Sequence, residues 1–198
     1  MKKILFFVFC MIILSSCNLP SYVFYNTGQT TGVDFTNGKW LLNEIDAPAD
    51  CTKYLKETSI SDFKILLGER LNYVTDVSGL LLTQKKIPLN PSKQIIADIK
   101  KGTNYDFFIN IKATQTRNDF GSIDLTPHRM SREGMNSNEV TIEIYDLKNS
   151  QIIYTQKVIA SVVKPKDNSD VHFSKPSRSL IIGAYNKLIR DIKNKSIK

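Results

Sequence analysis

The residue types best suited to chemistry gather in one polar stretch, residues 115–138. The stretch lacks the apolar periodicity of a helix or strand and contains Gly121, Pro127 and Gly134, so we expect a long loop. It holds two carboxylates, an imidazole and a hydroxyl, the groups that hydrolysis uses, in Asp119, Asp124, His128 and Ser131. Polar loops also collect such residues by chance, and the sequence has neither a nucleophile elbow nor a phosphate-binding glycine loop. A small periplasmic hydrolase or transfer enzyme that uses this loop is therefore kept as the alternative to a non-catalytic binding role.

The same loop is basic, because Arg117, Arg129 and Arg132 fall within or beside it. A guanidinium group is planar and binds phosphate or carboxylate through paired hydrogen bonds. The three arginines are therefore candidate contacts to an anionic partner. A solvated loop with no binding role is the other interpretation.

The amino terminus has the layout of an export signal. Lys2-Lys3 precedes an unbroken apolar run over residues 4–14. The run is too short for a membrane-spanning helix, which needs about 20 apolar residues. Ser15-Ser16 then places two small residues before Cys17, where a peptidase can seat the chain.

The Leu14-Ser15-Ser16-Cys17 segment resembles the signal of bacterial lipoproteins, in which an apolar residue and two small residues precede a cysteine. The resemblance implies cleavage between Ser16 and Cys17, a thioether-linked diacylglycerol on Cys17, and usually an acyl chain such as palmitate on the new amino group. Two or more acyl chains anchor stably, because each buried CH₂ contributes about 0.8 kcal/mol. Asn18 is not the aspartate that retains some lipoproteins in the inner membrane, which favours the outer membrane, facing the periplasm. The alternative is an ordinary secretory signal with a chance cysteine.

Cysteine and histidine usage argues against disulfides and metals. Once Cys10 leaves with the signal and Cys17 is lipidated, Cys51 remains alone, so no intramolecular disulfide is expected. A lone cysteine can be a nucleophile, but we expect Cys51 to be a buried small residue. His128 and His172 lie far apart without a further ligand at metal-binding spacing, so we expect no metal and no cofactor.

The chain is basic, with a net charge of +8, which falls to +6 once the two signal lysines are removed. This balance favours anionic lipid headgroups or acidic glycans as partners, although a lysine-rich solvated surface explains it as well. We expect no nucleic-acid partner.

Residues 17–38 are rich in Asn, Thr, Gly and Ser and nearly free of charge, which predicts a flexible lipidated tether. Residues 22–25 interrupt it with aromatic and apolar side chains. They either rest in the lipid interface or add a strand to the domain. A single globular domain is expected over residues 39–198.

Periodicity within that domain predicts an α+β (mixed α/β) fold, with helices packed against one sheet in the order β-α-β-α-β-β-β-α. Strands are expected at residues 40–45, 73–77, 105–114, 140–145 and 151–163, and helices at residues 50–71, 91–101 and 177–192. Asn90 is the expected N-cap of the second helix, and Gly102 its left-handed stop. Residues 140–163 are the clearest hairpin.

The Gly102-Thr103-Asn104-Tyr105-Asp106-Phe107-Phe108-Ile109 segment, the hairpin with Asp146-Leu147 at its turn, and the terminal helix resemble the LpoB, CsgG and TolB amino-terminal group of envelope domains. The whole chain also resembles lipoproteins of the Bacteroidota. The resemblance covers roughly residues 40–192 and is a pattern of elements rather than a strict motif. It implies a non-catalytic binding or assembly module for an envelope protein partner. The CsgG insertions and the TolB propeller repeats do not appear, so those specific functions do not carry over.

Overall fold

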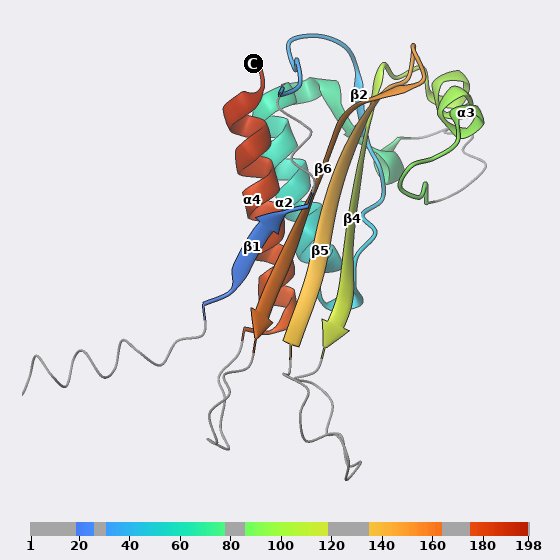
Figure 1. Ribbon diagram of the computed structural model, residues 1–198. Coiled ribbons are helices and arrows are strands. Elements are labelled where there is room, and N and C mark those ends of the chain that lie inside the picture. Colours follow the sequence, from blue (N-terminus) through green and yellow to red (C-terminus); the bar gives the residue numbers. More distant parts are fainter. Residues whose placement is uncertain (1–18, 26–30, 78–85, 119–134, 164–174, 198) are drawn as a thin grey trace, which may run out of the picture.

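Three long strands with alternating side chains form the centre of a sheet (Figure 1): β4 (Phe107–Asn118), β5 (Met135–Asp146) and β6 (Gln151–Val163). The computed structural model describes residues 19–25, 31–77, 86–118, 135–163 and 175–197. Both neighbouring pairs are antiparallel. Val140, Ile142 and Ile144 point to one face of β5 and are fully buried, as expected for alternating strand residues. The hairpin expected over residues 140–163 is confirmed.

Three shorter strands complete one mixed sheet of six strands, in the order β1-β6-β5-β4-β2-β3. β1 (Ser21–Phe24) runs antiparallel to β6, whereas β2 (Trp40–Leu42) is parallel to both β4 and β3 (Leu71–Tyr73). The expected fold class and element order are confirmed, with β1 added at the edge.

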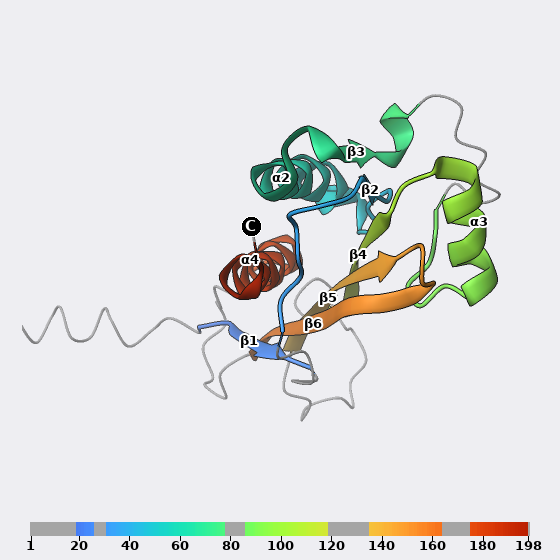
Figure 2. The ribbon, with the colours of Figure 1, turned by 90° about the horizontal axis from the view of Figure 1, so that it is seen from above.

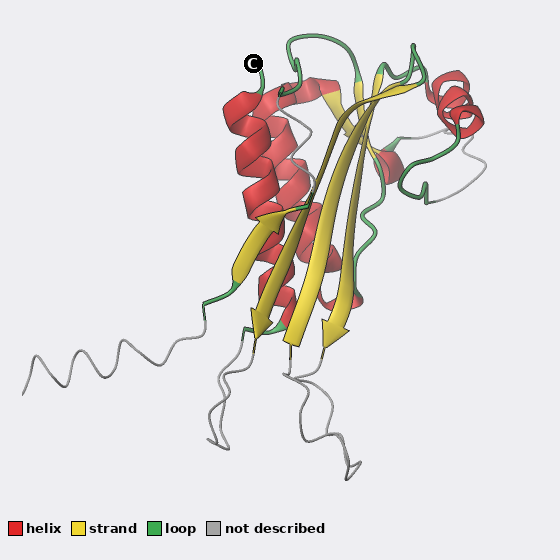
Figure 3. Ribbon diagram, in the orientation of Figure 1, coloured by secondary structure: helices red, strands yellow, loops and turns green. Residues whose placement is uncertain are grey.

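Helices cover the two faces of the sheet unequally. α2 (Ala49–Leu67) and α4 (Ser177–Lys195) lie side by side on one face, and α3 (Lys93–Thr103) lies on the other (Figures 2 and 3). We call these the inner and the outer face. The inner core is larger and holds Trp40, Phe63, Tyr154 and Tyr185, all fully buried. The outer core is a small cluster in which Ile96 and Ile99 of α3 are packed with Leu41, Phe108, Tyr145 and Leu147. Below α3 the outer face carries polar side chains.

Parts of the expected tether belong to the fold. β1 pairs with β6, which confirms the strand interpretation of residues 22–25. Val33 and Phe35 are 3% and 0% exposed, and the Phe35 N–H donates to the Ile197 carbonyl over 3.0 Å. The boundary expected at residue 39 is therefore wrong for these residues, because their apolar side chains fill the inner core.

The central strands also extend into the expected 115–138 loop. β4 continues to Asn118 and β5 begins at Met135, with Gln115 opposite Asn138 and Arg117 opposite Ser137 across a bulge. The polar side chains gave no alternating pattern, yet the backbone ladder continues because its hydrogen bonds do not depend on side-chain polarity. Residues 119–134 lie outside the described part.

Two expected helix ends move for conformational reasons. α2 stops at Leu67 rather than at residue 71, because Gly68 adopts a positive φ of 58°. α3 ends at Thr103 and is capped by Asn104, which is left-handed with φ of 55°, and Gly102 is inside the helix. Asparagine tolerates this conformation better than most non-glycine residues, and here it replaced the expected glycine stop.

The start of α3 and the position of β3 differ as well. Ser92, not Asn90, caps α3, since its hydroxyl oxygen accepts the Ile95 N–H over 3.3 Å. The strand expected at residues 73–77 is β3, which ends at Tyr73 because residues 74–76 form a 3₁₀ turn.

Candidate binding surfaces

The structure describes one of the three candidate arginines. Arg117 is half-buried in β4, opposite Ser137. Arg129 and Arg132 lie outside the described residues, as do Ser16 and Cys17. The same holds for the candidate hydrolytic group: Asp119, Asp124, His128 and Ser131. The lipidation site, the arginine cluster and the hydrolytic cluster therefore stay predictions.

Charge pairs connect side chains on the part of the outer face that α3 leaves uncovered. The Lys157 ammonium lies 3.1 Å from the Glu139 carboxylate across β5 and β6. Asp46 bridges two lysines, with its carboxylate 2.6 Å from Lys86 and 3.3 Å from Lys112. All five side chains are partly exposed, so these pairs order the surface more than they stabilise the fold.

Asp46 is the acidic centre of one half of this surface. Partial burial acts to raise the pKa of its carboxyl group, but hydrogen bonds and charges from Lys86 and Lys112 outweigh burial and hold the pKa below its usual value. Asp46 is therefore ionised at neutral pH, and its single negative charge reduces the repulsion between the two lysines.

Side chains of β1 and of the residue that follows it border the paired charges. Val23 and Tyr25 are 58% and 59% exposed, and Val23 lies beside Ile159 of β6. The Lys157 ammonium is 5.4 Å from the Tyr25 ring centroid, within cation–π range. Exposed apolar and aromatic groups beside satisfied charges are the mixture found in protein–protein interfaces.

A buried carboxylate lies beneath α3. Glu143 is 7% exposed, and one of its oxygens accepts both the Tyr145 hydroxyl over 2.5 Å and the Asn90 N–H over 2.9 Å. Burial, reinforced by the Glu143 carboxylate, raises the pKa of Tyr145 far above its usual value, so Tyr145 stays protonated and donates this bond. The Asn90 bond ties the segment before α3 to the sheet, and the Tyr145 bond, from the same strand as Glu143, holds the carboxylate in place.

Two asparagines make a second tie to the same segment. The Asn43 amide donates to the Ile87 carbonyl over 2.9 Å and to the Asn110 side-chain oxygen over 3.0 Å. Asn110 in turn donates to the Pro88 carbonyl over 2.8 Å. These buried amides replace the backbone partners that an irregular segment lacks, and so fix α3 in place.

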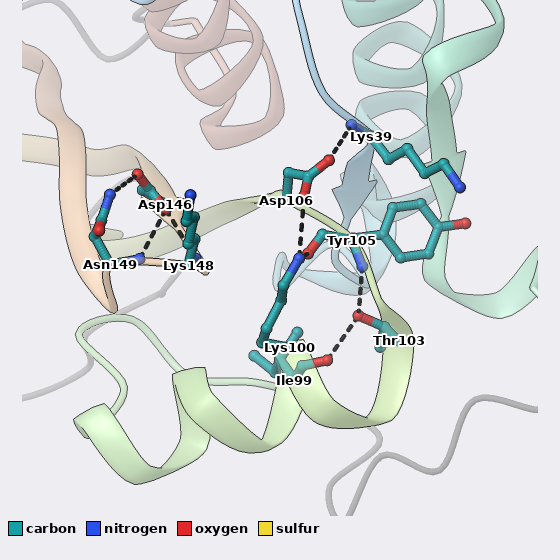
Figure 4. A network of polar contacts seen from close by, with 9 residues as sticks. All are labelled: Lys39, Ile99, Lys100, Thr103, Tyr105, Asp106, Asp146, Lys148 and Asn149. Carbon is teal, nitrogen blue, oxygen red and sulfur yellow. Dashed lines mark hydrogen bonds and ion pairs between the residues drawn. The ribbon is translucent and has the colours of Figure 1, made fainter.

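The end of the sheet near the β5–β6 turn is closed by two aspartates (Figure 4). Asp106 accepts the Lys39 N–H and the Lys100 ammonium, each over 3.0 Å. The hydrogen bond from the Lys39 N–H contributes most to holding the pKa of Asp106 below its usual value, and the hydrogen bond from the Lys100 ammonium contributes next. Asp146 accepts two backbone N–H groups of its own turn, from Lys148 and Asn149. We call this the turn end; its polar groups serve the fold.

The thiol of Cys51 is unsuited to nucleophilic chemistry. Cys51 is fully buried at the start of α2, and its thiol donates to the Pro48 carbonyl over 3.3 Å. Burial, and secondarily the charge of Asp50, raises the pKa of Cys51 to about 11. The expectation of a buried small residue is confirmed.

The described ranges hold neither a cluster of metal ligands nor a membrane-spanning helix. No three of their cysteine, aspartate and glutamate side chains are grouped so that they could hold a metal ion. Nor does any helix there combine the length and apolar character needed to cross a membrane.

Sequence reasoning missed most of the outer-face pairs. On the adjacent strands β5 and β6, Glu139 is opposite Ile159 and Lys157 is opposite Thr141, so the two charged residues are diagonal neighbours that a correct register would have brought together. The joining of Asp46 to Lys86 and Lys112 has no local signal, because the three residues come from separate segments.

The sequence matches no family model and no curated protein. Solved structures show a remote likeness. The PelC dodecamer from Paraburkholderia phytofirmans is 8% identical with a TM-score of 0.44, covering 91% of this chain and 100% of that one. Lipoprotein GNA1162 from Neisseria meningitidis is 12% identical with a TM-score of 0.41, over 80% and 99%. The LpoB C-terminal domain from Escherichia coli is 10% identical with a TM-score of 0.36, over 68% and 86%. At such values we base the function on the residues of this chain.

Proposed function

We propose that the protein is a lipid-anchored, non-catalytic binding module of the bacterial cell envelope. The observation that carries this proposal is the export signal ending in Leu14-Ser15-Ser16-Cys17, only four residues before β1 begins at Ser21. A diacylglyceryl group on Cys17 anchors the folded domain to the outer membrane, where the domain faces the periplasm.

The outer face is the surface proposed for an envelope protein partner. It offers the exposed Val23 and Tyr25 beside the Lys157–Glu139 pair, and the described helix on that face, α3, covers only its turn end. The basic group formed by Arg117 with Arg129 and Arg132 is proposed as a contact to an anionic partner. The inner face is filled by α2 and α4, so it is closed to partners.

Site-specific photo-crosslinking in intact cells tests the partner surface. A photoreactive residue is placed at Val23 or Thr155 on the outer face, and at Ile65 on α2, which is 72% exposed, as the matched control. We expect a discrete adduct with one envelope protein from both outer-face positions and none from Ile65. Adducts of equal yield from all three positions, or none from the outer face, would refute this assignment.

A further inference from the structure

We infer that the end of the sheet where β1 begins rests on the bilayer, with basic side chains on anionic phospholipid headgroups. We call it the anchor end. The inference deepens the proposed function, since it requires the lipid on Cys17. It specifies the orientation of the domain relative to the membrane.

The connection between the lipid on Cys17 and the folded domain is short. Cys17 and Ser21 are four residues apart, which spans at most about 14 Å when fully extended. The sheet is longer: Ser137 and Asp146 of β5 are nine residues apart, or about 30 Å at the rise of a strand. Acyl chains on Cys17 therefore cannot lie in the bilayer while the turn end faces it.

Strand register defines which residues share the anchor end. Ser21 pairs with Ser161, Ser161 with Ser137, and Ser137 with Arg117, so one row crosses the sheet from β1 to β4. α4 begins at the same end (Figure 1). Its Gly183 lies against the Tyr22 side chain, and Ser177 is six residues earlier, or about 9 Å along the helix.

The side chains at this end fit a lipid surface. Lys175 and Arg178 are exposed at the start of α4, and Arg117 adds a third basic group on the outer face. Among the described residues, Asp50 is an acid near Arg178, since both act on Cys51. Leu19 and Val163, 84% and 44% exposed, add apolar contacts for the interface. Cationic groups near an anionic leaflet are attracted to it, and apolar groups beside them insert at its boundary.

This orientation has a consequence for the partner surface. The strands run away from the membrane plane, so a partner reaches the outer face from the side. The turn end, with Asp146 and α3, points away from the bilayer.

Lipid-borne quenching tests the orientation. The full lipidated chain is reconstituted in vesicles of phosphatidylethanolamine with a minor share of phosphatidylglycerol, doped with a headgroup-nitroxide lipid. A fluorophore is attached to Val163→Cys at the anchor end or to Lys148→Cys at the turn end; the buried Cys51 thiol, with a pKa of about 11, reacts slowly. We expect strong quenching at position 163 and almost none at 148. Equal quenching at both positions, or stronger quenching at 148, would overturn the inference.

Charge variants test the headgroup contact. Lys175→Glu with Arg178→Glu should weaken quenching at position 163, and so should vesicles without phosphatidylglycerol. The matched control, Lys101→Glu with Lys148→Glu, reverses two exposed lysines toward the turn end and should leave it unchanged. Insensitivity to Lys175 and Arg178 would refute the electrostatic contact. A chain that carries no lipid refutes the proposed function instead, whereas a lipidated chain without ordered quenching refutes only the orientation.

Discussion

The docking of β1 on α4 depends on a glycine and can be tested by a double-mutant cycle. Gly183 lies against Tyr22, so a Cβ at position 183 would overlap the Tyr22 ring and hydroxyl. Lys187 also holds this strand, because its ammonium donates to the Tyr22 carbonyl over 2.5 Å. The tested changes are Gly183→Ala, Tyr22→Ala and their combination.

The sign of the effect should change with the background. Overpacking costs about 1–3 kcal/mol, whereas alanine in place of glycine inside a helix contributes about 0.5–1 kcal/mol. Gly183→Ala alone should therefore lower the free energy of unfolding by about 0.5–2 kcal/mol. With Tyr22→Ala the overlap is gone, and Gly183→Ala should raise the free energy of unfolding by about 0.5–1 kcal/mol.

Trp40 provides the signal for this cycle. It is the single tryptophan, fully buried and stacked on Phe107 with ring centroids 4.2 Å apart, so its fluorescence reports denaturant unfolding. If Gly183→Ala stabilises both backgrounds equally, Tyr22 does not pack on α4. The placement of the start of α4 at the anchor end would then lose the contact that supports it.

Three further outcomes are expected. Cys17→Ala should abolish labelling by a metabolic fatty-acid probe and block signal cleavage; label equal to that of the parent would rule out Cys17 as the acceptor. Because Cys51 is the single cysteine left for a disulfide and the described residues group no metal ligands, reductant or chelator should leave the unfolding midpoint unchanged, and a large shift in either would reveal a hidden cross-link or metal. The lowered pKa of Asp106 means that its carboxylate stabilises the fold above about pH 4, and that this contribution is lost as pH falls through the folded pKa. Asp106→Asn should therefore reduce the unfolding free energy at pH 7, with the difference from the parent shrinking as the pH falls through the folded pKa; a difference constant with pH would contradict the ionised pairing.

Local patterns determined much of the fold in advance. The alternation of Val140, Ile142 and Ile144 and the helical spacing around Ile96 each encode one buried face, so the element order followed from the sequence. β1 was left open because four residues carry too little periodicity to separate a strand from an interfacial segment. Its assignment depends on β6, which is distant in the chain.

Features that depend on partners across the sheet escaped prediction. The ladder beyond Thr114 runs through polar residues, whose pairing with residues 136–138 has no local signal. The left-handed stop of α3 fell on Asn104 although Gly102 is the better intrinsic choice, because the helix continues through Thr103, whose hydroxyl donates to the Ile99 carbonyl over 2.6 Å. The lipidation signal is different in kind: it is read in an unfolded chain, so sequence alone predicts it, and the described structure does not test it.

Intact-mass spectrometry of the protein purified from membranes tests the central claim most directly. The account predicts a mature chain whose first residue is Cys17, with added mass for a diacylglyceryl group and any further acyl chain on that residue. Tandem fragmentation should place all of that added mass on Cys17. A mature chain that begins elsewhere, retains residues 1–16, or carries no lipid on Cys17 would contradict a lipid-anchored module and remove the membrane orientation with it.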